Sequence, residues 1–326
     1  MSHRSPAVAV EHFLMRRCLL RLQTLLFCLT SIFASAQTPA DTREQLLRHL
    51  EGKRFQEAVL AGQKAVSEWP EDAVVRHYLG LAYFKTGDLK QAQQQLELSR
   101  DLDPKQADTH FDLALVFLSQ TNYPDAATEL ESSIKLSPTN PLAHVLLGRT
   151  YLNSNRSVQA IDEFKTAIRI DPNLPLGHYH LGFAYASLGR NDEAIAEYKT
   201  EHRIEQQKSE EIPEAVYELG HVVEESGQHE EAITYLQRAS ELDPRNPNVW
   251  YNLGKAQLSA GKVPQADASL RRSIELNPQD PRPHYQLARA LEKSGKADEA
   301  RAERARFAEL KKAQTATAGM ATDRDQ

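Results

Sequence analysis

The chain has very little cysteine. Its two cysteines, Cys18 and Cys28, both lie within the first 36 residues. A chain cleaved after residue 36 contains none, which excludes disulfides, thiol nucleophiles and cysteine-ligated metal sites from the mature protein. Such a protein must be stabilised by packing.

Long hydrophobic runs are also scarce. The longest is a run of 13 residues, 22–34, which follows three arginines. Its last residue begins the small-residue sequence Ala34-Ser35-Ala36. A helix that crosses a bilayer needs roughly 20 apolar residues. The pattern therefore predicts a secretory signal peptide over 1–36, cleaved before Gln37, with a retained membrane anchor as the alternative. We expect export to the periplasm or the extracellular space.

The chain has fewer basic than acidic residues. The chain has 39 Lys and Arg against 45 Asp and Glu, a formal net charge of −6. Loss of the leader, with its four arginines and one glutamate, moves this charge to −9. An acidic protein is poorly suited to nucleic acid or to an anionic membrane surface.

Catalytic motifs are missing from the sequence. It contains no Gly-rich phosphate loop, no His-Glu-x-x-His and no nucleophile elbow. We therefore expect no enzymatic activity, no catalytic residue, no cofactor, no metal and no small-molecule substrate.

The sequence does contain a strict internal period. One alanine per period recurs every 34 residues, with a single step of 38, at Ala58, Ala92, Ala126, Ala160, Ala194, Ala232, Ala266 and Ala300. Prolines keep the same count at Pro70, Pro104, Pro138, Pro172, Pro244 and Pro278. A generic helical bundle would not preserve such a count, so the period indicates a repeat array.

Residues 141–174 show the unit most clearly. Leu147-Gly148 is followed by Tyr151, then by Ala160, Phe164 and Pro172. This order resembles the tetratricopeptide repeat (TPR), and with its leader the chain is similar to TPR proteins of the exported bacterial type. The resemblance implies an all-α fold: an α-solenoid of about eight tandem helix-turn-helix units in a right-handed superhelix.

The period divides the chain into a leader, eight units and a tail. The first unit is degenerate, the fifth holds a four-residue insertion, the eighth includes a C-terminal cap, and the tail is expected to be disordered. The boundaries are 1–36, 39–72, 73–106, 107–140, 141–174, 175–212, 213–246, 247–280, 281–312 and 313–326. The insertion is either a tolerated lengthening of the second helix by one turn, or a bend or docking edge.

Small residues have defined roles in this pattern. Gly148 and its equivalents let the second helix come close, and we expect the alanine of that helix, Ala160 in this unit, to face them. Glycines between the two helices, such as Gly87, suit a helix end with positive φ. The prolines end the second helix.

Four histidines share one position in their units: His110, His144, His178 and His284. Stacked helices lie about 8–10 Å apart, whereas Zn–N bonds are about 2 Å, so these rings cannot share one metal ion. Trp250 occupies the same position in the seventh unit. We interpret the histidines as structural.

The resemblance also implies that first helices line a concave groove. The residue after the histidine position, and those four and seven further on, would point into it, although several could instead pack between units. The candidate protein-binding residues are His77, Leu81, Phe84, Phe111, Leu115, Leu118, Val145, Arg149, Leu152, Tyr179, Phe183, Tyr217, His221, Tyr251, Lys255, Arg282, Tyr285 and Arg289.

This predicted groove is apolar in its N-terminal half, carries several tyrosines, and becomes basic at its C-terminal end. It lacks the Lys and Asn of the clamp with which one branch of the family binds chaperone C-termini. The sequence favours a non-enzymatic scaffold that binds a peptide or helical segment of an envelope protein, with an acidic stretch opposite Lys255, Arg282 and Arg289. The alternative is a structural subunit that self-associates within an envelope complex.

Overall fold

The described part of the chain is entirely α-helical. A computed structural model of the protein describes residues 38–322, in which every regular element is an α-helix. It divides into two compact units, an N-terminal unit up to Gln120 and a C-terminal unit from Thr121. Over this range, no helix combines the length and apolar character that crossing a bilayer requires. The predicted signal peptide lies outside the described residues.

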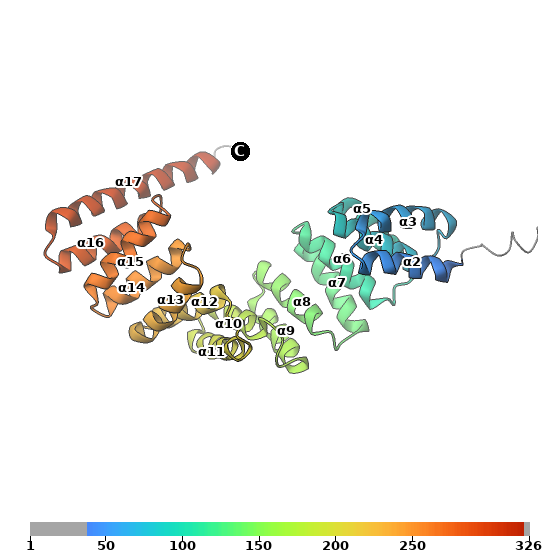
Figure 1. The fold of residues 1–326 in the computed structure, drawn as a ribbon, viewed down its shortest axis with the longest axis horizontal. Helices are drawn as coiled ribbons and strands as arrows, with labels where there is room; N and C mark the ends of the chain where they lie inside the picture. Colours follow the sequence, from blue (N-terminus) through green and yellow to red (C-terminus); the bar gives the residue numbers. More distant parts are fainter. Residues whose placement is uncertain (1–37, 323–326) are drawn as a thin grey trace, which may run out of the picture. The chain divides into compact units, whose positions relative to one another are not determined.

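The N-terminal unit contains five helices (Figure 1). They are α2 (Pro39–Glu51), α3 (Phe55–Glu68), α4 (Ala73–Thr86), α5 (Leu89–Leu102) and α6 (Ala107–Ser119). Consecutive helices pack against each other, and α2 also contacts α4.

The C-terminal unit contains the other eleven described helices. They are α7 (Tyr123–Leu136), α8 (Pro141–Asn153), α9 (Ser157–Ile170), α10 (Gly177–Ser187), α11 (Asn191–Lys208), α12 (Pro213–Glu225), α13 (His229–Leu242), α14 (Pro247–Ser259), α15 (Val263–Leu276), α16 (Pro281–Lys293) and α17 (Ala297–Thr322). The first and second helix of each repeat in this unit pack together, as in α8 with α9 and α14 with α15. The expected all-α solenoid of about eight repeats is confirmed.

Helix starts follow the repeat count. Seven first helices begin at the first residue of their predicted units: Pro39, Ala73, Ala107, Pro141, Pro213, Pro247 and Pro281. At five of these seven starts, the side chain before the helix accepts free N–H groups of the first turn, as Asn140 does from Leu142 and Ala143. Proline at the first helical position sacrifices no hydrogen bond there.

The fifth repeat departs from this rule. Its first helix, α10, begins at Gly177 rather than Pro175, and Leu176 before it adopts the left-handed conformation with φ +60°. The cause is Glu201 of α11, whose carboxylate accepts N–H bonds from Leu176 and His178, both at 3.0 Å, and from Tyr179 at 3.2 Å.

Glu201 occupies a position that small residues hold in the neighbouring repeats, Ala167 in the fourth and Ala239 in the sixth. It is only 2% exposed. A buried carboxylate is stable at a helix N-terminus because the free N–H groups and the helix dipole both compensate its charge. The larger side chain thus explains why α10 starts late.

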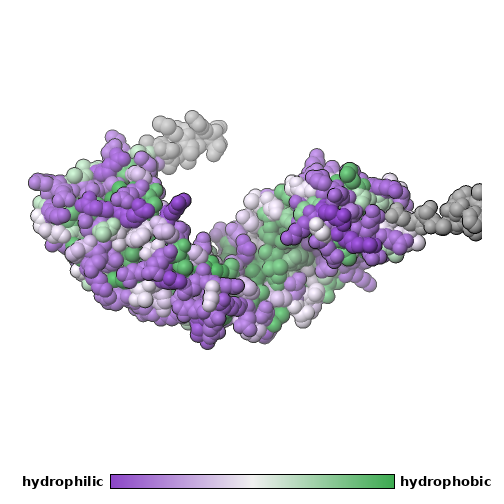
Figure 2. Space-filling view, viewed as in Figure 1, coloured by the Kyte–Doolittle hydropathy of each residue, from purple (hydrophilic) through white to green (hydrophobic). Residues whose placement is uncertain are grey.

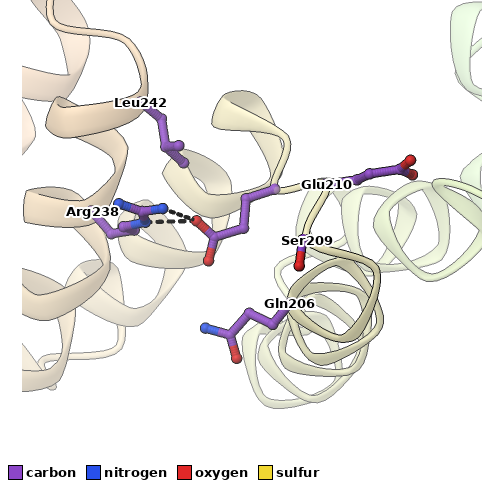
Figure 3. A pocket seen from close by; sticks show the side chains of 6 residues that line it. Gln206, Ser209, Glu210, Arg238 and Leu242 are labelled. Atoms are coloured by element: carbon purple, nitrogen blue, oxygen red, sulfur yellow. Dashed lines mark hydrogen bonds and ion pairs between the residues drawn. The ribbon is translucent and has the colours of Figure 1, made fainter.

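The four inserted residues lengthen α11. This helix has 18 residues, whereas the second helices α9 and α13 have 14. Four residues are about one turn, so the buried face keeps its register. At the end of α11 a cavity of about 430 Å³ opens, lined by Gln206, Ser209, Glu210, Glu211, Arg238 and Leu242 (Figure 3). Arg238 spans it with a 2.6 Å ion pair to Glu211.

A glycine on the first helix allows the two helices of a repeat to pack closely. A Cβ added to Gly148 of α8 would lie 2.6 Å from Cε1 of Phe164 on α9. The nearest side chain is therefore Phe164, not the expected Ala160, because the aromatic ring reaches across to the glycine. Any larger residue at position 148 would push α8 away from α9.

The turn between the two helices of each repeat has one residue with positive φ. Glycine takes this place at Gly87, Gly189, Gly227, Gly261 and Gly295, as the sequence predicts. In the first, third and fourth repeats the same conformation is adopted by Lys53, Thr121 and Asn155. The repeat geometry imposes the conformation even where the residue disfavours it.

The C-terminal end differs from expectation. Helix α17 continues to Thr322, so residues 313–322 are helical rather than disordered. The segment is alanine-rich and contains no proline, and alanine is the strongest helix former.

Candidate functional site

In four repeats, the side chain at the position shared by the four histidines bonds to the carbonyl of the proline that ends the preceding repeat. His110 Nε2 bonds to the carbonyl oxygen of Pro104 at 3.1 Å, and His144 Nε2 to that of Pro138 at 3.2 Å, in both cases six residues back. Trp250 Nε1 donates to the carbonyl of Pro244 at 3.0 Å. In the second repeat the donor is Nε of Arg76, which reaches Pro70 at 2.7 Å.

In three of these histidines, the Nδ1 atom lies against a carboxylate of the paired helix. The Nδ1 atoms of His144, His178 and His284 lie 2.6 Å from glutamates 19 residues later: Glu163, Glu197 and Glu303. The hydrogen bond that His144 donates to Glu163 raises the pKa of His144. Each ring thus joins two helices of its own repeat, and no metal-ligand cluster occurs among the described residues.

The candidate binding residues of the N-terminal unit come from α4 and α6. Five are half-buried apolar residues: Leu81, Phe84, Phe111, Leu115 and Leu118. His77 is buried instead, and its Nε2 lies 2.7 Å from Oδ2 of Asp112. His77 therefore links α4 to α6 and presents little surface to a ligand.

In the C-terminal unit, four candidates from α8 and α10 meet around one pocket of about 260 Å³. Arg149, Leu152, Tyr179 and Phe183 line it, together with Asn153 and His180. Phe183 is 43% exposed, unusual for a phenylalanine. The guanidinium of Arg149 is exposed and has no hydrogen-bond or ion-pair partner among the described residues. Val145, also predicted to bind, is buried in α8.

The wall of this pocket is uncharged apart from Arg149. Burial, with a smaller contribution from Arg149, lowers the pKa of His180 to about 4, so the ring is neutral at pH 7. It stacks on Phe164 at 5.5 Å. Burial raises the pKa of Tyr179 to about 12, with further upward effects of Glu218 and Glu214 and a downward effect of Arg149. Tyr179 thus lies between a cation and an acidic helix.

That acidic helix is α12. It carries Glu214, Glu218, Glu224 and Glu225 and no Lys or Arg. The candidate His221 lies between two of them, with Nδ1 3.8 Å from Glu218 and Nε2 3.5 Å from Glu225. The hydrogen bond to Glu218 raises the pKa of His221. The candidate Tyr217 stacks on His221 and accepts a bond from Asn252 at 2.9 Å.

The predicted basic end is largely neutralised. The ammonium of Lys255 lies 2.6 Å from Oε2 of Glu224, which is only 4% exposed. Arg282 pairs with both oxygens of Asp280, bonds to Asn248, and lies over the ring of Tyr251 at 4.9 Å. Two of the three predicted cations are therefore held by carboxylates, and only Arg289 has none.

Arg289 instead donates to Oε1 of Gln286 at 2.9 Å. The neighbouring candidate Tyr285 is 43% exposed and packs on Phe307 of α17 at 5.4 Å. Among the candidate residues, Arg149, Leu152, Tyr179 and Phe183 of the fourth and fifth repeats meet around one pocket.

Sequence reasoning missed several residues of this face. Asn153 and His180 line the pocket, and Glu218 and Glu225 surround His221. Each lies on a first helix, one position away from a predicted residue or one turn from it. A prediction that also included the residues beside each predicted position, and those one turn away, would have found them.

Family models match most of the array. The model described as TPR repeat matches residues 148–189 and 220–261, and two tetratricopeptide repeat models match residues 247–280 and 269–302. A model of subunit 3 of the anaphase-promoting complex, or cyclosome, matches residues 51–133. No curated protein matches the sequence.

Solved structures match in fold. The crystal structure of the APC/C hetero-tetramer Cut9–Hcn1 is similar with a TM-score of 0.54 at 18% identity, over 78% of this chain and 48% of that chain. This chain thus spans about half of that protein's length. MamA from Desulfovibrio magneticus RS-1, residues 41 to the end, is similar with a TM-score of 0.50 at 19% identity, over 53% of this chain and 96% of that one. At such identities the likeness shows the fold alone.

Proposed function

Because the chain is a tetratricopeptide repeat protein, and therefore has the fold of a protein–protein interaction scaffold, we propose that it binds a peptide or helical segment of an envelope protein along its first helices. The proposal rests on the pocket that residues of α8 and α10 form. There the exposed Phe183 and the half-buried Leu152 lie beside the unpaired guanidinium of Arg149. Figure 2 shows hydrophobic residues at the surface over α8, in the middle of the view.

Exposed aromatic side chains beside an arginine are typical of binding hot spots. The same side chains lack what catalysis needs. No described nucleophile is activated at this pocket, and His180 is half-buried and stacked on a ring. We therefore propose binding without catalysis.

A chemical cross-linking experiment tests the binding proposal. Partners cross-linked to the protein in intact cells are identified for the wild type, for a Leu152→Ser, Phe183→Ser double variant, and for Val158→Ser. Val158 is the matched control because it is an apolar side chain 64% exposed on a second helix, α9. Circular dichroism verifies that all three proteins are folded.

Loss of specific partners in the double variant, with retention in Val158→Ser, supports the proposal. The same partners in all three proteins would overturn it. Sedimentation of the purified protein separates partner binding from self-assembly, since a self-assembling subunit sediments faster as its concentration rises.

We further propose that the protein acts after export, in the periplasm or outside the cell. Cleavage before Gln37 would leave the start of α2 intact, because Thr38 and Asp41 cap that helix reciprocally. Mass spectrometry of the protein from a periplasmic extract should find Gln37 as the first residue. An uncleaved protein confined to the cytoplasm would refute export.

A further inference from the structure

The first helices of the C-terminal unit differ sharply in charge. On α8 the only Lys, Arg, Asp or Glu is Arg149, and α10 has none. Helix α12 carries four glutamates and no Lys or Arg. Among those four, only Glu224 has a Lys partner, Lys255, while Glu218 and Glu225 meet only His221.

Resting on the proposed function, we propose that α8, α10 and α12 bind an extended partner segment that carries an acidic residue, then a large apolar residue, and then a basic residue. The acidic residue meets Arg149. The apolar residue packs against Leu152 and Phe183. The basic residue meets Glu218 and Glu225.

Charge complementarity selects this occupant. An exposed guanidinium without a carboxylate attracts an anion, and its placement against an apolar wall reduces the solvent screening of that attraction. Two carboxylates flanking one imidazole keep a net negative charge whether or not His221 is protonated. A segment of one charge sign would be repelled at one of the two ends.

Tyr179 lines the same pocket as Arg149, and it lies between that arginine and the acidic helix α12. Arg149 lowers the pKa of Tyr179, whereas Glu218 of α12 raises it. Neighbouring first helices that pack 8–10 Å apart would set the two charged ends about 16–20 Å apart. An extended chain rises about 3.3 Å per residue, so the acidic and basic residues should be ~6 positions apart, with the apolar residue near the middle.

Three synthetic peptides of equal length test the inference by fluorescence anisotropy with the purified protein at low salt. All have phenylalanine at the centre and alanine and serine elsewhere. One carries Glu and Lys ~3 positions on either side of the phenylalanine, the second carries Glu on both sides, and the third carries Lys on both sides. Because each is tested as a charge pattern, the direction in which the chain binds does not affect the result.

We expect the mixed peptide to bind about fivefold more tightly than either like-charged peptide, a difference that disappears at high salt. In Arg149→Glu the order should change, with the double-lysine peptide binding tightest. Arg169→Glu is the matched control, since Arg169 is an exposed arginine outside the predicted binding face, on the second helix α9, whose guanidinium lies 3.5 Å from the hydroxyl of Thr166 rather than against a carboxylate. Its order of affinities should match the wild type.

Equal binding of all three peptides, abolished by Phe183→Ser, would overturn the charge inference and leave the proposed function standing. An order that Arg149→Glu and Arg169→Glu change alike would also overturn it. If none of the peptides binds, this inference fails, and the cross-linking experiment decides the proposed function separately.

Discussion

Arg149 and Lys255 occupy the same position of their repeats, the fourth and the seventh, yet only one is free to bind an anion. Lys255 pairs with Glu224, which lies 31 residues earlier on the preceding first helix. The residue 31 positions before Arg149 is Leu118. A cation on a first helix is thus available to a ligand only when the preceding repeat supplies no carboxylate.

Arg289 extends the comparison. It also holds this position, and 31 residues before it stands Leu258, which is buried and apolar. Two of these three cations therefore keep their charge exposed, whereas that of Lys255 stabilises the fold. Buried carboxylates differ in the same way. Glu224 forms an ion pair with Lys255, whereas Glu205 has no cationic partner among the described residues.

Removal of the cation from the paired site should have the largest effect. Lys255→Ala leaves the carboxylate of Glu224 buried without its ammonium partner, and we expect the free energy of unfolding to fall by about 2–3 kcal/mol. Arg149→Ala removes an exposed and unpaired group and should change it by no more than about 0.5 kcal/mol. Urea unfolding followed by circular dichroism measures both. Equal losses would contradict the distinction between the two sites.

The buried, unpaired carboxylate of Glu205 should make the free energy of unfolding depend on pH. Burial raises the pKa of Glu205 from 4.5 to about 7, with smaller upward effects of Glu201 and Glu211, against an N–H bond from Ile212. Its Oε1 atom has no hydrogen-bond partner. Between about pH 4.5 and pH 7 the unfolded chain releases this proton while the folded protein retains it, so stability falls as pH rises through that window.

Glu205→Gln should remove this cost while keeping an oxygen for the Ile212 N–H. We expect the variant to be more stable than the wild type by about 2 kcal/mol at pH 8 and equal to it at pH 4. The difference between the two unfolding free energies, measured across this range, cancels the titration of the other groups. A difference that is constant with pH would show that Glu205 ionises normally.

The smallest effect is expected on peptide affinity, when Lys255 loses the negative charge of its partner Glu224. Glu224→Gln removes the opposing charge from Lys255 while preserving a hydrogen bond to it. Affinity for the double-glutamate peptide should rise about threefold, the value of one exposed ion pair. The double variant Glu224→Gln, Lys255→Gln should bind this peptide as the wild type does. A wild-type affinity in Glu224→Gln would mean that Lys255 is inaccessible.

The repeat count predicted most of the fold because each helix start depends on residues next to it in the chain. Proline and capping residues such as Asn140 act locally, so seven of the first helices begin where expected. The start of α10 could not be predicted in this way. It depends on Glu201, 24 residues later in the chain, and only the packed structure shows where that carboxylate points.

The candidate site was predictable in position but not in charge. Counting placed Arg149, Leu152 and Phe183 on one face, and the structure brings them together around a pocket. Counting also placed Lys255 and Arg282 there, but their charges are compensated by Glu224 and Asp280. Glu224 lies on the predicted face itself, seven positions after Tyr217, whereas Asp280 precedes α16. Counting shows which residues share the face, but not which of them form ion pairs with each other.

The N–H bond to the proline carbonyl has a consequence for how this protein can change over generations. Arg76, His110, His144 and Trp250 all supply it, although one is a guanidinium, two are imidazoles and one is an indole. The turn needs only an N–H with sufficient reach. Mutation can therefore exchange the size and the chemistry of the side chain at this position, one repeat at a time, while the scaffold is inherited intact.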